Sequence, residues 1–422
     1  MSDATVAMTQ PPSKNPLKHL RPGDLRGIAQ LATEATTSVA RIAEGVHQSV
    51  WDSLGVAGRA PGQTGGITGF VYQAVQGVAQ LLGKGADTLL ATLQMRLESR
   101  QGSEPATPQR EAALAVLNGV MGDRLLASNN PLATPMTLRH QGLALDWQAP
   151  PAGLKPKVLL MIHGLCMNDL QWQRKGHSHG DALGKALGMT PLYLHYNTGL
   201  HVSQNGEMFS QAMQTLIEQW PVPVEELVVI GHSMGGLVAR SACHHAEVVG
   251  LNWPATLRRL VCLGTPHHGA PLERGGQLID SLLGKSPYLA PFARLGKGRS
   301  AGISDLRFGN VQQADWSAHR KHDQKVDGRL PTPLPLGVQT YLVAAVQAQR
   351  VDDARNAWIG DGLVPRASAL GEHESAAMSL LVPDSHKLVV TNSNHWDLLN
   401  HAEVYQQLLA WLSQPFESER RD

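Results

Sequence analysis

The chain has 422 residues, of which 42% are hydrophobic and 17% are charged, an ordinary composition for a globular protein. The formal net charge of +1 gives no electrostatic basis for binding nucleic acid, so we expect no such partner. The three cysteines (Cys166, Cys243 and Cys262) are too few for a disulfide framework, and no apolar run approaches the roughly 18 residues of a membrane span. Without a secretory signal pattern, we expect a cytoplasmic protein, with peripheral membrane contact left open.

The first part of the chain is predicted to be helical. Residues 1–23 are polar and contain prolines, so we expect a disordered tail. From Asp24, apolar residues recur at steps of three and four, which predicts an amphipathic helix, and 67–93 repeats the pattern after a break at 55–66. This helical hairpin is expected to pack against the domain that follows it or against a second copy of itself. The alternative is contact with a lipid surface, although its polar faces are not rich in Lys or Arg.

A linker and a third helix precede the first strands. Residues 99–109 resemble a linker, and a helix is expected over about 110–126. Together these segments complete an N-terminal helical region at 24–130. Two short strands within 137–147, joined at a Gln-Gly turn, predict a β-hairpin that opens a second domain at 131–422.

Strands then alternate with helices. Strands are expected at 158–162, 191–196, 224–230, 260–263, 340–346 and 387–391, with helices near 178–187, 206–219 and 404–412 and directly after residue 236. This alternation predicts an α/β fold, a mostly parallel sheet with helices on both faces. Residues 270–338 interrupt it and are expected to form a cap or lid above the sheet, or else a simple surface excursion.

The motif Gly231-His232-Ser233-Met234-Gly235 lies between a predicted strand and a predicted helix. In this context a G-x-S-x-G motif forms a tight turn that presents the serine above the end of the sheet. We therefore expect Ser233 to be a nucleophile. The alternative is a glycine-rich turn in which the serine is incidental.

A serine nucleophile needs a base and an acid that orients the base, which follow the serine in this architecture. Asp361 stands between two glycines after the strand at 340–346, and Asp352 and Asp353 compete with it. His395 follows the last strand and is the expected base. His401 is the alternative, although its position at a helix start favours a capping or surface role.

Two backbone N–H groups are needed to stabilise a negatively charged oxygen. One is expected from Met234, directly after the nucleophile, and the other from Leu165, in the loop after 158–162. We expect no cofactor and no metal. The paired histidines at 177/179, 244/245 and 267/268 lack matching cysteine or carboxylate spacing and are expected at the surface or in packing.

Five motifs in this order resemble the α/β-hydrolase superfamily, over about residues 135–415. They are Ile162-His163-Gly164-Leu165, Gly231-His232-Ser233-Met234-Gly235-Gly236, Gly264-Thr265-Pro266-His267-His268-Gly269, Asp361-Gly362-Leu363-Val364-Pro365 and His395-Trp396-Asp397-Leu398-Leu399. Within the superfamily, the chain is similar to bacterial lipases and carboxylesterases and to the catalytic domain of GPI inositol-deacylase. The chain departs from the secreted lipases in lacking a signal peptide, and from some of them in lacking a clear calcium or zinc ligand set.

The resemblance implies hydrolysis of a carboxylic ester, lipid-like or another acyl ester, by a Ser233–His395–Asp361 triad. It implies the oxyanion donors Leu165 and Met234. A thioesterase or acyltransferase with the same triad is the first alternative. The second is a helical module that binds a membrane or an inclusion, with hydrolysis as a secondary activity. The sequence does not give the oligomeric state.

Overall fold

The computed structural model describes residues 23–24, 26–27, 30, 108–270, 300–317, 327–351 and 359–416. The chain divides into two compact units, Met1–Arg110 and Glu111–Asp422. In the smaller unit the described residues between 23 and 30 are helical, and Arg110 donates hydrogen bonds of 2.6 and 2.7 Å to Asp24. The predicted tail up to residue 22 and the rest of the predicted hairpin lie outside the described residues, as do 271–299 and 318–326 of the predicted cap.

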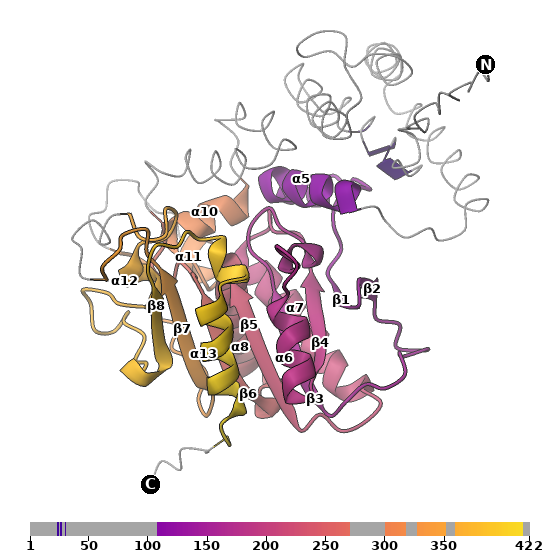
Figure 1. Ribbon diagram of the computed structural model, residues 1–422. Helices are drawn as coiled ribbons and strands as arrows, with labels where there is room; N and C mark the ends of the chain where they lie inside the picture. Colours follow the sequence, from indigo (N-terminus) through magenta and orange to yellow (C-terminus); the bar gives the residue numbers. More distant parts are fainter. Residues whose placement is uncertain are drawn as a thin grey trace, which may run out of the picture. The chain divides into compact units, whose positions relative to one another are not determined.

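The larger unit is built around one sheet of eight strands (Figure 1). In chain order the strands are β1 (Thr137–His140), β2 (Leu143–Ala144), β3 (Lys157–Ile162), β4 (Thr190–His195), β5 (Glu226–His232), β6 (Leu257–Leu263), β7 (Gln339–Ala345) and β8 (Lys387–Val390). Their order across the sheet is β2-β1-β4-β3-β5-β6-β7-β8. All neighbouring pairs from β4 to β8 are parallel, whereas β1 is antiparallel to both β2 and β4. The predicted mostly parallel sheet, including the opening hairpin, is confirmed.

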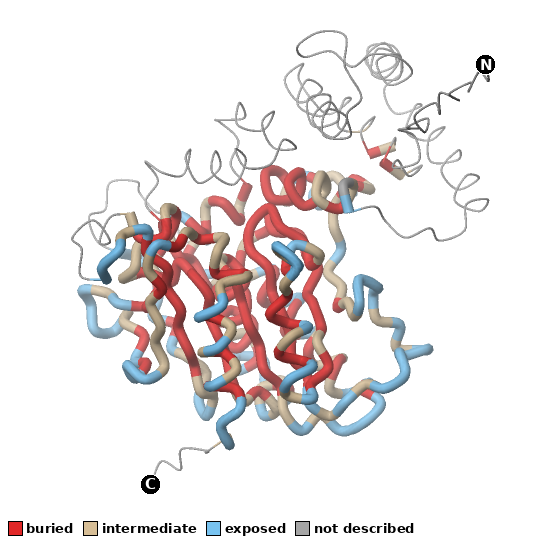
Figure 2. Tube along the Cα trace, viewed as in Figure 1, coloured by how far each residue is buried: buried red, intermediate tan, exposed pale blue. Residues whose placement is uncertain are grey.

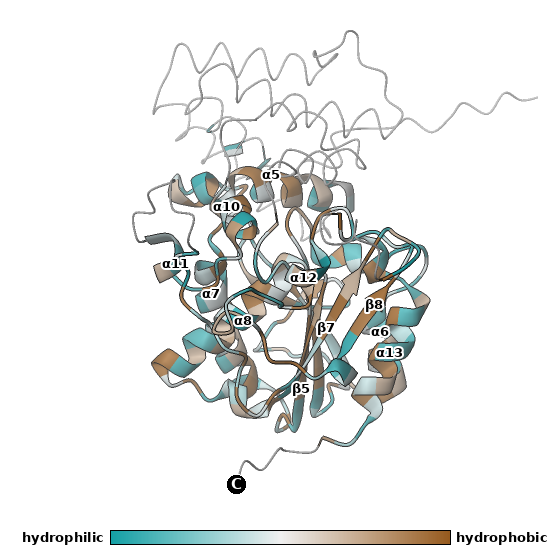
Figure 3. Ribbon diagram, turned by 90° about the vertical axis from the view of Figure 1, so that its left-hand side faces the viewer, coloured by the Kyte–Doolittle hydropathy of each residue, from teal (hydrophilic) through white to brown (hydrophobic). Residues whose placement is uncertain are grey.

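Helices cover both faces of the sheet. The α-helices of this part of the chain are α5 (Pro108–Ala127), α6 (His179–Leu187), α7 (Val202–Gln219), α8 (Met234–Val249), α10 (Ala301–Phe308), α11 (Ala314–Ser317), α12 (Arg366–Ala369) and α13 (Ala402–Ser413). Figure 3 shows α7 and α8 on one side of the strands and α6 and α13 on the other. Because helices cover both faces, the central strands β3 and β5 are buried after their first residue and are apolar over Val158–Ile162 and Leu227–Ile230 (Figure 2).

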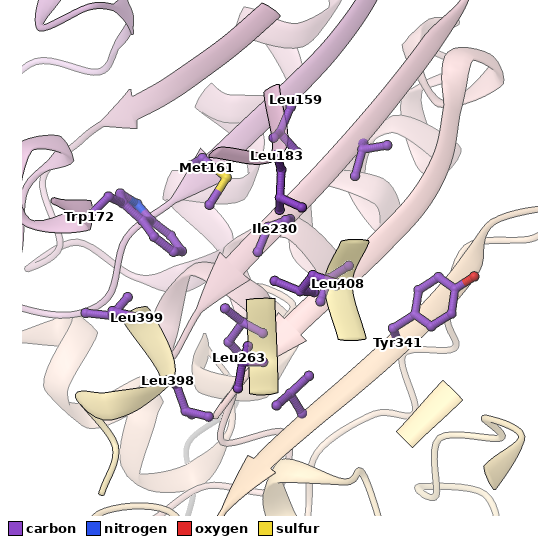
Figure 4. Close-up of a cluster of buried hydrophobic side chains, with 14 of the residues drawn as sticks. Leu159, Met161, Trp172, Leu183, Ile230, Leu263, Tyr341, Leu398, Leu399 and Leu408 are labelled. Atoms are coloured by element: carbon purple, nitrogen blue, oxygen red, sulfur yellow. The ribbon is translucent and has the colours of Figure 1, made fainter. Parts of the chain in front are cut away.

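The core on the α6 and α13 side is formed by every second residue of neighbouring strands, because side chains alternate between the faces of a strand. Leu159 and Met161 of β3 and Ile230 of β5 belong to this cluster, and each is fully buried (Figure 4). Leu183 of α6 and Leu408 of α13 pack on them from above. The two helices on this face are therefore fixed to the strands whose ends carry the predicted site.

The strand order places a switch point between β3 and β5. From β3 the chain moves to β4 on one side, and from β4 it crosses to β5 on the other side of β3. In sheets of this kind, ligands bind beyond the carboxyl ends of the strands at the point where the order reverses. The loop after β3 contains Leu165, and the turn after β5 contains Ser233.

Helix α5 lies across the edge of the sheet where the parallel strands end (Figure 1). The sequence analysis assigned this helix to the N-terminal helical region at 24–130. In the structure the larger compact unit begins at Glu111 and contains nearly all of the helix. The helix is interrupted at Met121, whose φ of −145° and ψ of 22° are not helical. Among the described residues, no helix is long and apolar enough to cross a membrane.

Candidate active site

The predicted strand, turn and helix around Ser233 are present. Strand β5 ends at His232, α8 begins at Met234, and Ser233 between them has φ of 54° and ψ of −122°. A positive φ in a residue with a side chain costs on the order of 1–3 kcal/mol and is typical of functional sites. The Ser233 N–H donates a 2.8 Å hydrogen bond to the Leu263 carbonyl at the end of β6, which holds the turn against the neighbouring strand.

The two glycines of the motif are required by close backbone contacts. A Cβ on Gly235 would lie 2.2 Å from the Ile162 carbonyl oxygen, and a Cβ on Gly231 would lie 2.5 Å from the Gly236 nitrogen. Both neighbours are backbone atoms that cannot move aside. Helix α8 can therefore begin directly against the end of β3, and the side chain of Ser233 remains only partly buried beside this edge.

Asp361 and His395 form a buried pair. The Nδ1–H of His395 donates a 2.6 Å hydrogen bond to Oδ2 of Asp361, and both side chains are almost fully buried. The other carboxylate oxygen, Oδ1, accepts from the backbone N–H groups of Leu363 (2.9 Å) and Val364 (2.8 Å). These two bonds fix the orientation of the carboxylate. With Nδ1 protonated and bound, the neutral imidazole has its lone pair on Nε2, the arrangement that a general base requires.

The loops after β7 and β8 are joined by backbone hydrogen bonds that support this pair. The N–H of His395 donates to the Asp361 carbonyl (3.2 Å), and the N–H of Ser393 donates to that of Val346 (3.1 Å). The competitors Asp352 and Asp353 lie outside the described residues. The alternative base, His401, is the N-cap residue of α13 and is not the partner of Asp361.

His232 connects the turn that contains Ser233 to the loop after β8 that contains His395 (the histidine loop). The sequence analysis did not identify this role. Its Nε2–H donates a 3.2 Å hydrogen bond to the backbone carbonyl of His395, and the two rings have centroids 4.7 Å apart. Burial, and then repulsion from His395, hold the pKa of His232 well below its ordinary value. The ring beside the candidate base therefore stays neutral, and the residue that precedes Ser233 lies against His395.

The candidate oxyanion donors come from the ends of β3 and β5. Met234 is the first residue of α8, where backbone N–H groups have no partner within the helix and partial positive charge accumulates. Leu165 lies in the loop after β3, and the preceding Gly164 approaches the serine closely, since a Cβ on Gly164 would lie 3.0 Å from Cβ of Ser233. The side chains of Leu165 and Met234 are both buried. The structure thus brings these two segments together beside Ser233.

The loop after β3 is supported by a side chain from the loop after β4. The Tyr196 hydroxyl donates a 2.7 Å hydrogen bond to the His163 carbonyl, and the two rings stack with centroids 4.5 Å apart. The Cys166 thiol in the same loop is fully buried, and burial raises its pKa to about 12. Cys166 therefore stays protonated at neutral pH and is not a competing nucleophile.

His179, at the start of α6, is also neutral and is joined to the histidine loop. Its Nε2–H donates to the Leu398 carbonyl (3.0 Å), and its Nδ1 lies 2.8 Å from Nε2 of His177. Burial lowers the pKa of His179 from 6.5 to about 4.

Among the described residues, no cluster of histidine, cysteine and carboxylate side chains could hold a metal ion.

We expect His179 to make folding sensitive to acid. Because its pKa is lower in the folded chain, the unfolded chain binds more protons between pH 6.5 and pH 4, so stability is full above pH 6.5 and falls as the pH decreases towards 4. At pH 5 this loss is about 2 kcal/mol. Urea unfolding at pH 7 and pH 5 should show a smaller loss for His179→Gln than for the wild type. An equal loss in both proteins would contradict this prediction.

A family model, the PGAP1-like alpha/beta domain, matches residues 190–283, from β4 through α8 and β6. This match agrees with the resemblance that the sequence motifs indicate. Together with the sheet described above, it supports the α/β-hydrolase fold. No curated protein matches the chain.

A comparison with solved structures found matches of low sequence identity. The mature lipase BlEst2 of Bacillus licheniformis is 18% identical, with a TM-score of 0.37, and the alignment covers 62% of this chain and 96% of that one. Lipase B of Aspergillus fumigatus is 11% identical with a TM-score of 0.38, covering 94% and 87% respectively. A thermophilic esterase from Thermogutta terrifontis is 14% identical with a TM-score of 0.37, covering 66% and 93%.

Proposed function

We propose that this chain, which has the α/β-hydrolase fold, is a serine hydrolase that cleaves carboxylic esters. The observation that carries the proposal is the buried hydrogen bond between His395 and Asp361. Ser233, in a strained turn between strand and helix, follows His232, whose ring contacts that of His395. A buried carboxylate that orients an imidazole, and a strained, partly buried serine on the adjoining turn, support acyl transfer. An ester rather than an amide is proposed because of the motif resemblance to lipases and carboxylesterases.

The proposed reaction proceeds through a covalent acyl-enzyme. Nε2 of His395 takes the proton from Ser233 as Oγ attacks the ester carbonyl, and Asp361 stabilises the resulting imidazolium. The N–H groups of Leu165 and Met234 stabilise the oxygen of the tetrahedral intermediate. The protonated His395 then gives its proton to the departing alcohol. Water activated by the same nitrogen releases the carboxylic acid and restores Ser233.

Covalent labelling tests the proposal directly. A fluorophosphonate probe phosphonylates an activated serine, so we expect one adduct on the peptide that contains Ser233, located by mass spectrometry. Ser241, further along α8 and buried, is an internal control that should stay unlabelled. His395→Ala should prevent labelling, because the serine then has no base. A wild-type protein that is not labelled, or that is labelled at another serine, would contradict the proposal.

A further inference from the structure

Helix α5 contacts the loop after β3 at Gly119, a position without a side chain. A Cβ placed on Gly119 would lie 2.3 Å from the sulfur of Cys166 and 3.0 Å from its nitrogen and Cα. A larger residue at position 119 would have to displace the Cys166 thiol and push the Cys166 backbone away by a few tenths of an ångström. The contact falls directly after Leu165, the candidate oxyanion donor. The helix therefore touches the candidate site from a segment that precedes every strand of the sheet.

The backbone of Cys166 is held in a demanding conformation. Its φ is 58°, the left-handed region that a residue with a side chain rarely adopts, and its N–H donates a 3.1 Å hydrogen bond to Oγ1 of Thr198. Thr198 is 1% exposed, so this hydroxyl has no competition from bulk water. Gly119 on one side and Thr198 on the other thus fix the peptide that follows Leu165.

Three further contacts hold α5 in place. Nδ2 of Asn197 donates to the Gly122 carbonyl (2.9 Å), and Oγ of Ser300 donates to the Gly119 carbonyl (2.7 Å). The N–H of Ala301 donates to Oδ2 of Asp123 (3.1 Å). These bonds join the helix to the loop after β4 and to the beginning of α10. They lie on both sides of the interruption at Met121, where the regular helical hydrogen bonds are broken.

The first turn of α5 has an additional ionic attachment. Glu111 lies 3.4 Å from the Arg139 guanidinium, which lies 3.0 Å from Asp169. Asp169 begins the short helix η2 (Asp169–Trp172), which follows the loop that contains Leu165. His195 at the end of β4 also contacts Asp169, at 3.0 Å. Helix α5 therefore contacts the loop after β3 at Cys166 and is linked, through Arg139, to Asp169 at the end of that loop. Two attachments of this kind make it a rigid support for the loop.

We infer that α5 and Thr198 position the loop after β3, which contains the candidate oxyanion donor Leu165. Gly119 of α5 and Thr198 are the positioning residues, and they direct the N–H of Leu165 into the active site. This inference rests on the proposed function, because it assigns support to an oxyanion donor of that reaction. Neither residue contacts the substrate in this role. Each acts through the backbone of Cys166, so its loss should weaken stabilisation of the tetrahedral intermediate more than binding of the ester.

The test compares Thr198→Val, which removes the hydroxyl, with Thr198→Ser, which keeps it. Loss of an oxyanion donor lowers the rate on the order of 10²–10³-fold, and displacement of a donor that is still present lowers it less. We therefore expect kcat of Thr198→Val to fall about 10- to 100-fold, with KM unchanged. Thr198→Ser should retain most of the activity. A boronic acid inhibitor, whose adduct is tetrahedral, should bind Thr198→Val more weakly by about the factor by which kcat/KM falls.

Gly119→Ala tests the second support independently, and Leu126→Ala is its control because Leu126 is 49% exposed on the same helix. We expect Gly119→Ala to lower kcat in the same way and Leu126→Ala to leave it unchanged. Hydrogen exchange of the peptide 163–168 gives a readout that does not depend on activity. It should be faster in Thr198→Val and Gly119→Ala at temperatures where both remain folded, and unchanged in Thr198→Ser and Leu126→Ala.

The outcomes separate this inference from the proposed function. An active wild type whose Thr198→Val and Gly119→Ala variants keep its kcat and its boronate affinity would overturn the inference alone. Equal losses in Thr198→Val and Thr198→Ser would also overturn it, since the hydroxyl would not matter. A wild type that neither hydrolyses esters nor reacts with the fluorophosphonate would overturn the proposed function and this inference with it.

Discussion

Ser233→Ala should reduce kcat for ester hydrolysis on the order of 10⁶-fold, close to the complete loss of a triad. Alanine has no nucleophile to form the acyl-enzyme, and His395 and Asp361 then have no proton to transfer. The fold should tolerate the change, because the Ser233 side chain is only partly buried and alanine removes just its hydroxyl. The measurement is the initial rate with p-nitrophenyl esters from acetate to palmitate, with the melting temperature recorded for each protein.

Ser375→Ala is the matched control, since Ser375 is an exposed serine outside the candidate site. It should keep the wild-type rate with every ester. Equal rates for the wild type and Ser233→Ala would show that another group carries the activity. The wild-type profile also identifies the substrate class. A preference for short acyl chains indicates an esterase, and activity that rises sharply above the solubility limit of the ester indicates a lipase.

Asp361→Asn should lower kcat about 10⁴-fold while the protein stays folded. Oδ1 of Asp361 accepts two backbone N–H groups, from Leu363 and Val364, so the amide oxygen of an asparagine must occupy that position. The amide nitrogen then faces Nδ1 of His395 at the place where the carboxylate oxygen lies 2.6 Å away. An N–H donor there favours the tautomer with the proton on Nε2, and that nitrogen can no longer accept the proton of Ser233.

The control is Asp384→Asn, because the Asp384 side chain is fully exposed and the change in charge is the same. It should leave kcat unchanged. The rate of fluorophosphonate labelling should fall in Asp361→Asn together with kcat, since both need a deprotonated serine. If Asp361→Asn kept the wild-type rate, another acid would have to orient the base, and Asp352 and Asp353 would become the candidates.

The strands were predictable because each carries its own local pattern. The apolar runs before Gly231 and after Lys157 are continuous, and a strand covered on both faces needs no polar alternation. The Asp361–His395 contact could be predicted as well, because both residues follow neighbouring parallel strands, whose carboxyl ends meet at one edge. The predicted roles of Ser233, Leu165 and Met234 in catalysis remain predictions.

The contacts of Gly119, Thr198 and His232 were not predictable. From the sequence, Gly119 is expected only to weaken a helix, because glycine has a low helix propensity. Its contact with Cys166 is visible only in the folded chain. Thr198 and His232 carry no local signal for their partners, since a hydroxyl or an imidazole can serve in many settings. Thr198 does lie in the loop after β4, three residues past the end of that strand, and this position is the feature that could have marked it.

The attachment of α5 determines where this chain can be shortened. A fragment that begins at Thr137 retains all eight strands and the Ser233, Asp361 and His395 side chains. It would lose the carbonyl partners of Ser300 and Asn197 and would expose the loop that ends at Cys166 to water. A minimal catalytic fragment for crystallisation or directed evolution should therefore begin at or before Pro108, and libraries that vary the acyl specificity should leave α5 intact.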